Sequence, residues 1–199
     1  SSFSWSPSAT LNSGSNANPE ATPLITTDYI VLVSNSGCTD QDTIRVNVSV
    51  PSVSAGTDLA VCVGDSVQIQ AQGTGSVVWS PAGGLSATNV LDPFAFPIAT
   101  TDYIVTLTDS ATCIAQDTIQ VLVNQLPVAN AGADTSACTN EMIVIGGAPT
   151  GPSGSTYTWS PAGGLSDANS ANPTATITGT QIYTVTVTDS STCSSTDVI

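Results

Sequence analysis

Basic side chains and histidine are almost absent from this chain of 199 residues. Arg45 is the one basic residue against 15 Asp and Glu, which gives a formal net charge of −14 at pH 7. A chain with a single cation has no surface that neutralises phosphates, which argues against nucleic acids and anionic membrane surfaces as partners. Without histidine there is no imidazole base and no ordinary His-ligated metal site. The composition therefore argues against most enzymes.

Several other signals are missing as well. The chain has no Gly-x-Ser-x-Gly elbow, no phosphate-binding loop, no Cys-x-x-Cys and no carboxylate pair in an acid/base context. No apolar run approaches the roughly 18 residues of a membrane span. Only 8% of the residues are charged while 40% are hydrophobic, and the mean hydropathy is +0.21, so charge-driven disorder is disfavoured too. We expect a folded protein that is not an enzyme and has no cofactor.

An internal repeat is the main feature that is present. The octapeptide Trp-Ser-Pro-Ala-Gly-Gly-Leu-Ser occurs at 79–86 and 159–166, and a degenerate copy begins at Trp5. A Tyr follows each Trp after 24 residues, a Cys follows each Tyr after nine or ten, and an Asp follows each Cys after four. Landmarks that recur in register three times indicate a tandem array. These landmarks are Trp5, Trp79, Trp159, Tyr29, Tyr103, Tyr183, Cys38, Cys113, Cys193, Asp42, Asp117 and Asp197.

A second pattern, Pro-x4-Gly-x-Asp-x3-Cys, marks the joints between the repeats. It runs from Pro51 to Cys62 and again from Pro127 to Cys138. We therefore predict three repeats. The first (1–50) is the C-terminal part of a truncated repeat, the second (51–126) is complete, and the third (127–199) lacks its last few residues. On this reading the chain is an excerpt of a longer array that begins inside a repeat.

Period-two alternation runs through the chain, and no stretch shows helical periodicity. Val67, Ile69 and Ala71 share one face of their run, as do Val105 and Leu107 further on. Such runs of Val, Ile and Thr, punctuated by Gly, Pro, Asn and Ser, are typical of half-buried strands. We predict an all-β protein, a tandem array of small immunoglobulin-like β-sandwiches. Its core should contain one Trp and one Tyr per repeat, namely Trp5, Trp79, Trp159, Tyr29, Tyr103 and Tyr183.

The five cysteines suggest disulfides within the repeats. The second repeat contains Cys62 and Cys113 and the third contains Cys138 and Cys193. A domain of this size is marginal alone, and closing a loop of roughly 50 residues adds about 4 kcal/mol on the chain-entropy model. We predict the pairs Cys62–Cys113 and Cys138–Cys193. Cys38 would then pair outside the segment, because its partner would lie upstream of Ser1. Disulfides imply an oxidising, extracellular compartment.

The third repeat carries a family resemblance. Its segments Trp-Ser-Pro-Ala-Gly-Gly-Leu-Ser, Asn-Pro-Thr-Ala-Thr, Tyr-Thr-Val-Thr-Val-Thr-Asp and Thr-Asp-Val-Ile are similar to the PKD/Ig-like repeats of large secreted surface adhesins of Bacteroidota. These include gliding-motility-associated adhesins exported by type IX secretion. The resemblance implies a non-catalytic stalk or spacer of a cell-surface adhesin or filament. Its expected partners are the neighbouring repeats of the same chain and, in a filament, identical chains.

Acidic residues and Asp-Ser/Thr pairs raise two further questions. Asp58 and Asp134 at the joints, with Asp109 and Asp189 beyond the strands, are weak candidate ligands for structural calcium. The alternative is that each carboxylate hydrogen-bonds its own turn. Asp followed by Ser or Thr and an aliphatic residue is similar to the O-glycosylation signal of Bacteroidota. The sites of that pattern are Thr43, Ser66, Ser110 and Thr118.

Two functional alternatives remain open at this level. The chain could be a ligand-binding module that contacts a glycan or a protein, for example through the Gly- and Pro-rich insertion at 146–154. It could also be a set of accessory repeats of a secreted enzyme whose catalytic domain lies elsewhere. The amino-acid sequence does not name the ligand or surface that the full-length protein holds.

Overall fold

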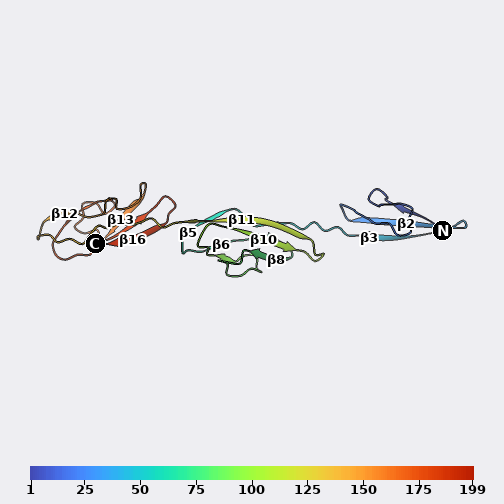
Figure 1. Cartoon of the computed structure of the whole chain (residues 1–199), viewed down its shortest axis with the longest axis horizontal. Coiled ribbons are helices and arrows are strands. Elements are labelled where there is room, and N and C mark those ends of the chain that lie inside the picture. The colour runs from blue at the N-terminus through green and yellow to red at the C-terminus, as the bar shows by residue number, and fades with distance from the viewer.

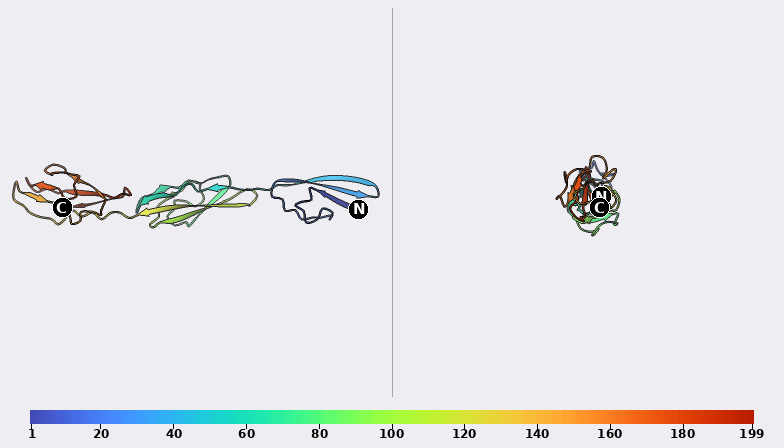
Figure 2. Two further views of the ribbon diagram at one scale, coloured as in Figure 1. Left: turned by 90° about the horizontal axis from the view of Figure 1, so that it is seen from above. Right: turned by 90° about the vertical axis from the view of Figure 1, so that its left-hand side faces the viewer.

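A computed structural model describes residues 1–199. Three bundles of strands follow one another along a single long axis, and the view along that axis shows one narrow projection (Figures 1 and 2). Every regular element is a β-strand. The predicted fold class, an all-β array of small sandwiches, is confirmed. The structure has no helix of the length and apolarity needed to cross a membrane.

The second repeat is the most complete of the three. Its main sheet has the order β5-β11-β10-β8, in which β5 runs parallel to β11 and the other pairs are antiparallel. Two short pairs, β4 with β7 and β6 with β9, form the opposite layer. The strands are β4 (Val53–Ser54), β5 (Leu59–Cys62), β6 (Val67–Gln68), β7 (Gln72–Gly73), β8 (Ser76–Ser80), β9 (Phe94–Ala95), β10 (Thr101–Thr108) and β11 (Ile114–Asn124).

The core of the second repeat lies between these two layers. Alternate residues of β10 and β11 point inward, and residues 53–71 supply the apolar side chains that cover them. Trp79 is buried and its Nε1 donates to the carbonyl of Val90 at 2.9 Å, so the indole also fastens the loop after β8. Burying one Trp between two small sheets contributes a large share of the apolar area that the repeat buries. The buried core residues are Ala55, Ile69, Ala71, Val77, Trp79, Ala95, Tyr103, Val105, Leu107, Ile119 and Val121.

The third repeat has the same plan with fewer paired strands. Its sheet β13-β15-β16 faces the pair β12-β14 across a smaller core around Trp159. The insertion at 146–154 folds back onto this body, since Asn130 donates its N–H to the carbonyl of Thr150 at 2.9 Å and Thr150 is buried. The strands are β12 (Met142–Val144), β13 (Thr156–Ser160), β14 (Thr174–Thr176), β15 (Thr184–Thr188) and β16 (Ser194–Val198).

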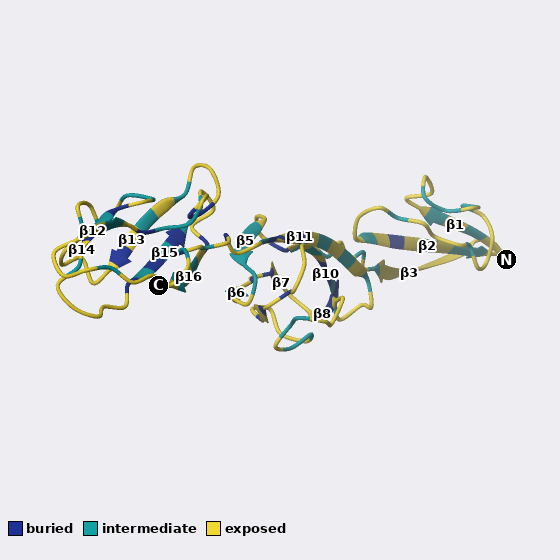
Figure 3. Ribbon diagram, turned by 60° about the vertical axis from the view of Figure 1, so that its left-hand side comes forward, coloured by how far each residue is buried: buried dark blue, intermediate teal, exposed yellow.

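The first repeat is a single sheet without a second layer. Its strands β1 (Ser2–Ser6), β2 (Thr27–Asn35) and β3 (Cys38–Val46) pair in the order β1-β2-β3. Tyr29 is buried, but Trp5 is only half-buried, although the sequence predicts it to be a core residue. The physical reason is that no segment corresponding to residues 53–71 covers this face. The edge strand β3 is almost entirely exposed (Figure 3).

Candidate functional site

The joint between the second and third repeats is closed by a disulfide. Cys62, the last residue of β5, is bonded to Cys193, which lies in the hairpin before β16. The two Cα atoms are 5.6 Å apart and the two residues are 131 positions apart in the sequence. The bond therefore connects one repeat to the next. Cys38, Cys113 and Cys138 are free.

This bond corrects both predicted intra-repeat pairs. Cys62 pairs with Asn124 at one end of β11, whereas Cys113 directly precedes Ile114 at the other end. A strand of 11 residues spans about 35 Å at 3.3 Å per residue, whereas a disulfide needs Cα atoms within about 7 Å. The pair Cys62–Cys113 is therefore excluded by the fold.

The same geometry separates Cys138 from Cys193. Cys138 lies between Ala137 and Thr139, which line one end of a groove that Ile199 also borders. Cys193 lies at the opposite end of β16, about 20 Å from Ile199 at the rise of a strand. The second and third repeats thus each hold a hairpin cysteine at one end and a joint cysteine at the other, which explains why the bond forms between repeats.

The hairpin that carries Cys193 is held by Asp189. The carboxylate Oδ1 of Asp189 accepts the N–H groups of Ser191 at 2.9 Å and Cys193 at 3.0 Å. The N–H of Asp189 in turn donates to the carbonyl of Cys193 at 2.9 Å. Asp followed by Ser forms this kind of turn because the short carboxylate bonds its own backbone two residues on. The turn fixes the position at which the sulfur of Cys193 meets the second repeat.

The linker lies against this hairpin. Ser195 donates its hydroxyl to the carbonyl of Pro127 at 2.5 Å, and Pro127 is buried. On the other side, the N–H of Val63 donates to the carbonyl of Asn124 at 2.9 Å, so the chain after β5 stays attached to the end of β11. The joint is therefore a packed contact with two covalent connections, the linker and the disulfide.

The first joint has the same hairpin but no bond. Asp109 accepts the N–H groups of Ala111 and Cys113, each at 2.8 Å, as Asp189 does in the third repeat. Ser49, at the end of the first repeat, donates its hydroxyl to the other oxygen of Asp109. This hydrogen bond, together with those from the N–H groups of Cys113 and Ala111, lowers the pKa of Asp109. The thiol of Cys113 is half-buried and unbonded.

Two other landmark carboxylates accept backbone hydrogen bonds from the first residues of the second and third repeats. Asp117 on β11 accepts the N–H of the buried Ala55 at 2.8 Å, and Asp197 on β16 accepts that of the buried Ala131 at 2.8 Å. These backbone hydrogen bonds lower the pKa of both carboxyl groups. The sequence marks the two positions as landmarks but does not reveal their role, because their partners are more than 60 residues upstream.

The four calcium candidates do not come together. No group of three or more Cys, Asp or Glu side chains that could hold a metal ion is present. Asp109 and Asp189 bond their own hairpins, and Asp58 accepts the N–H of Gln120 at 2.9 Å. Asp134 borders the groove of the third repeat. The residues of the glycosylation-like pattern, Thr43, Ser66, Ser110 and Thr118, are all exposed.

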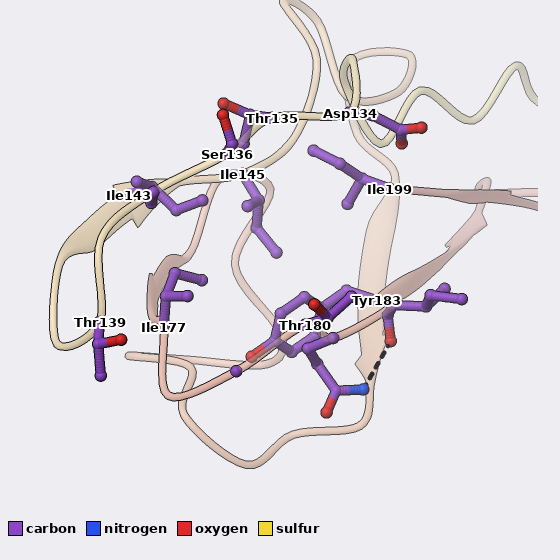
Figure 4. A pocket seen from close by; sticks show the side chains of 14 residues that line it. Asp134, Thr135, Ser136, Thr139, Ile143, Ile145, Ile177, Thr180, Tyr183 and Ile199 are labelled. Atoms are coloured by element: carbon purple, nitrogen blue, oxygen red, sulfur yellow. Dashed lines mark hydrogen bonds between the residues drawn. The ribbon is translucent and has the colours of Figure 1, made fainter.

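A groove of about 470 Å³ opens at the far end of the third repeat (Figure 4). Ile143, Ile145 and Ile177 form its apolar part, while Asp134 stands at its rim beside Ile199. In the second repeat, residues 121–124 of β11 fill the corresponding space between β5 and β10.

The similarities of this chain to known proteins are structural and distant. No protein-family model and no curated protein sequence matches it. Among solved structures, the insect immune protein hemolin is similar with a TM-score of 0.40 at 10% identity, covering 98% of this chain and 66% of hemolin. Drosophila OTK extracellular domains 3–5 give 0.35 at 10% identity, with 99% and 84% covered. Mouse cadherin-23 EC22–24 gives 0.36 at 13% identity, with 99% and 84% covered.

Proposed function

We propose that this chain is a structural spacer of an extracellular surface protein, in which small β-sandwiches in line hold another part of the molecule away from the cell. The disulfide between Cys62 and Cys193 is the observation that carries the proposal. A joint with one covalent connection bends and twists about its linker. A second connection beside the linker removes most of that freedom, so two repeats behave as one rigid rod.

The surface chemistry supports the same role. The net charge of −14 is spread over a chain with one cation, Arg45, which forms an ion pair with Asp28 on the first repeat. A uniformly acidic surface keeps extended rods soluble and separate by mutual repulsion. A stable disulfide requires an oxidising compartment, which supports an extracellular location. The resemblance of the repeat sequence to PKD/Ig-like repeats of Bacteroidota adhesins is consistent with this assignment.

Small-angle X-ray scattering tests the rigidity of the joint. The oxidised chain should scatter as an extended rod, whereas reduction or the variant Cys62→Ser should lower the radius of gyration and raise the apparent flexibility. Cys138→Ser is the matched control, because it removes a free thiol and leaves the bond intact. Scattering that stays the same after reduction would contradict the spacer model.

A ligand-binding role is the second candidate, and the groove of the third repeat, with its isoleucine lining and Asp134 at its rim, is the place to test it. The insertion at 146–154 is less suitable than its composition suggests, since Thr150 and Gly151 are buried against the body of the repeat. Placing a charge in the groove with Ile177→Glu should abolish a glycan-array or pull-down signal if the groove binds a ligand. The same charge at exposed Val144, which does not line the groove, is the matched control.

A further inference from the structure

The first joint contains half of a disulfide site that matches the complete one in the second joint. Cys113 and Cys193 occupy the same position in the same hairpin, each with its N–H bonded to the Asp four residues earlier. Thr112 and Thr192, just before them, share a left-handed backbone with φ of 65° and 66°. Cys193 is bonded and Cys113 is free. The difference therefore lies in what stands opposite each hairpin.

Opposite Cys193 stands the end of a parallel strand pair. β5 pairs with residues 121–124 of β11, and this pairing places Cys62 beside Asn124 at the joint. The N–H of Gln120 donates to Asp58 just before β5, which sets the register of the pair. The Pro-x4-Gly-x-Asp-x3-Cys segment thus works as a strand that delivers its cysteine to the next repeat.

Opposite Cys113, the corresponding sheet edge of the first repeat has no neighbouring strand. Asp42 and Asp117 are equivalent landmarks of the first and second repeats. By the same spacing, residues 46–49 of the first repeat correspond to residues 121–124 of the second. β3 pairs with β2 on one side and has no strand on the other. Ser49 nevertheless reaches the hairpin of Cys113 through its hydrogen bond to Asp109, so this edge ends at the right place.

The face beside this edge is also uncovered. Ile44 on β3 is 55% exposed, whereas its counterpart Ile119 on β11 is 1% exposed beneath residues 53–71. Val46 is half-buried, while its counterpart Val121 is fully buried. The open face (Trp5, Val31, Ile44 and Val46) therefore lacks the apolar layer that residues 53–71 provide in the second repeat.

We propose that the first repeat accepts an extended segment of the same Pro-x4-Gly-x-Asp-x3-Cys type, and that its cysteine forms an inter-repeat disulfide with Cys113. The segment pairs parallel to residues 46–49, covers the open face, and carries its sulfur to Cys113 as β5 carries Cys62 to Cys193. Two separate observations, the uncovered sheet edge and the free twin of a bonded cysteine, require the same occupant. The disulfide at the second joint is then one instance of a connection that every joint of this type makes.

The bond formation needs an oxidant, and a low-molecular-weight disulfide supplies it. The thiols of Cys113 and of the segment each lose a proton and together give up two electrons to form the S–S bond. Glutathione disulfide accepts these electrons and protons and is cleaved to two molecules of glutathione. The exchange proceeds through attack of a thiolate on a disulfide sulfur.

A synthetic peptide with the sequence of residues 51–72 tests the proposal on the intact chain. In glutathione buffer, mapping of the products by mass spectrometry should find the peptide on Cys113. Cys38 and Cys138 are more exposed than Cys113 and so provide the internal comparison. Docking raises the local concentration of the peptide thiol, so the adduct at Cys113 should form at least about tenfold faster than at either exposed cysteine.

Matched variants separate docking from simple thiol chemistry. The peptide with Cys62→Ser should still protect the backbone amides of residues 46–49 from hydrogen exchange. Ile44→Asp in the protein should abolish both the protection and the selectivity, whereas Ile30→Asp on the opposite face of the sheet should not. Adducts that form faster at Cys38 and Cys138 than at Cys113, or an absence of protection, would overturn the proposal. The rigidity measured by scattering concerns the second joint, so the two proposals can fail independently.

Discussion

At the scale of single residues, the equivalent Trp of the three repeats has two different environments. Trp79 and Trp159 are 1% and 2% exposed, whereas Trp5 is half-buried. Each indole donates to a carbonyl 11 residues further on, so the local loop is the same in all three repeats. What differs is the second layer, which supplies the apolar atoms that surround the ring. The octapeptide predicts the loop, and only the long-range packing decides the burial.

Replacing these indoles should therefore have unequal effects. Trp79→Ala removes a fully buried side chain and should destabilise the second repeat by about 3–5 kcal/mol. Trp5→Ala should cost clearly less, because part of that ring is already in contact with water. Hydrogen exchange resolved by repeat measures both, and an equal loss in the two variants would contradict the description of the first repeat as uncovered.

The landmark carboxylates predict how stability depends on pH. Hydrogen bonds from backbone N–H groups lower the pKa of Asp117 and Asp197 relative to the unfolded chain. A lowered folded pKa means that the stabilisation is complete above the unfolded value and is lost as the pH falls through the folded one. Thermal melts should therefore be flat near neutral pH and should decline below the ordinary Asp range, around pH 4.

Asp117→Ala should lower the melting temperature of the second repeat at pH 7 and weaken its decline in acid. The reason is that the buried N–H of Ala55 loses its acceptor. Asp42→Ala is the matched control, since this carboxylate bonds only the N–H of the adjacent Thr43. A variant at Asp42 that is as destabilised as the one at Asp117 would contradict this account.

At the scale of elements, the hairpins before the final strands carry local strain. Thr112 in the second repeat has φ of 65°, a left-handed conformation that a β-branched side chain adopts at a cost. Glycine has no such cost, so Thr112→Gly should stabilise the second repeat by up to about 1 kcal/mol. Urea unfolding measures the gain. Thr118→Gly on extended β11 provides the contrast and should destabilise the repeat.

The strands themselves could be predicted from the sequence, and their partners could not. The alternation of Tyr103, Val105 and Leu107 gives both the strand and its inner face, and all three side chains are buried. The parallel pairing of β5 with β11 has no such signal, because four residues of mixed character carry no information about a partner some 60 positions away. The disulfide was mispredicted for the same reason. Repeat spacing gives the positions of Cys62 and Cys113 in the sequence, but it does not show that β11 holds them at its opposite ends.

At the scale of the whole molecule, the bond between Cys62 and Cys193 redirects mechanical load. When the chain is pulled from its two ends, force passes through the disulfide, and residues 63–192 lie inside the closed loop. The covalent bond therefore shields residues 63–192 from extension, whereas β4, β5 and β16 stay on the path of the force. A rod built in this way resists force at the joint without relying on the modest stability of each small repeat.

Single-molecule pulling should show this shielding directly. Because the loop spans 131 positions, reduction should lengthen the fully extended chain by about 450 Å at roughly 3.5 Å per residue. Cys62→Ser should give the longer extension without any reductant, and Cys138→Ser should behave as the unmodified chain does. Equal extensions before and after reduction would show that the bond does not carry the load.

The pairing of Cys62 with Cys193 also sets an order of events during biosynthesis. Cys38 is made before Cys62, and Cys113 and Cys138 are made before Cys193, so a chain oxidised before it folds offers Cys62 the wrong thiols first. Folding of the second repeat removes the choice of Cys113, because β11 then holds Cys62 and Cys113 at opposite ends. Correct maturation therefore requires each sandwich to fold before its joint cysteine is oxidised, and that cysteine must wait for the following repeat to arrive.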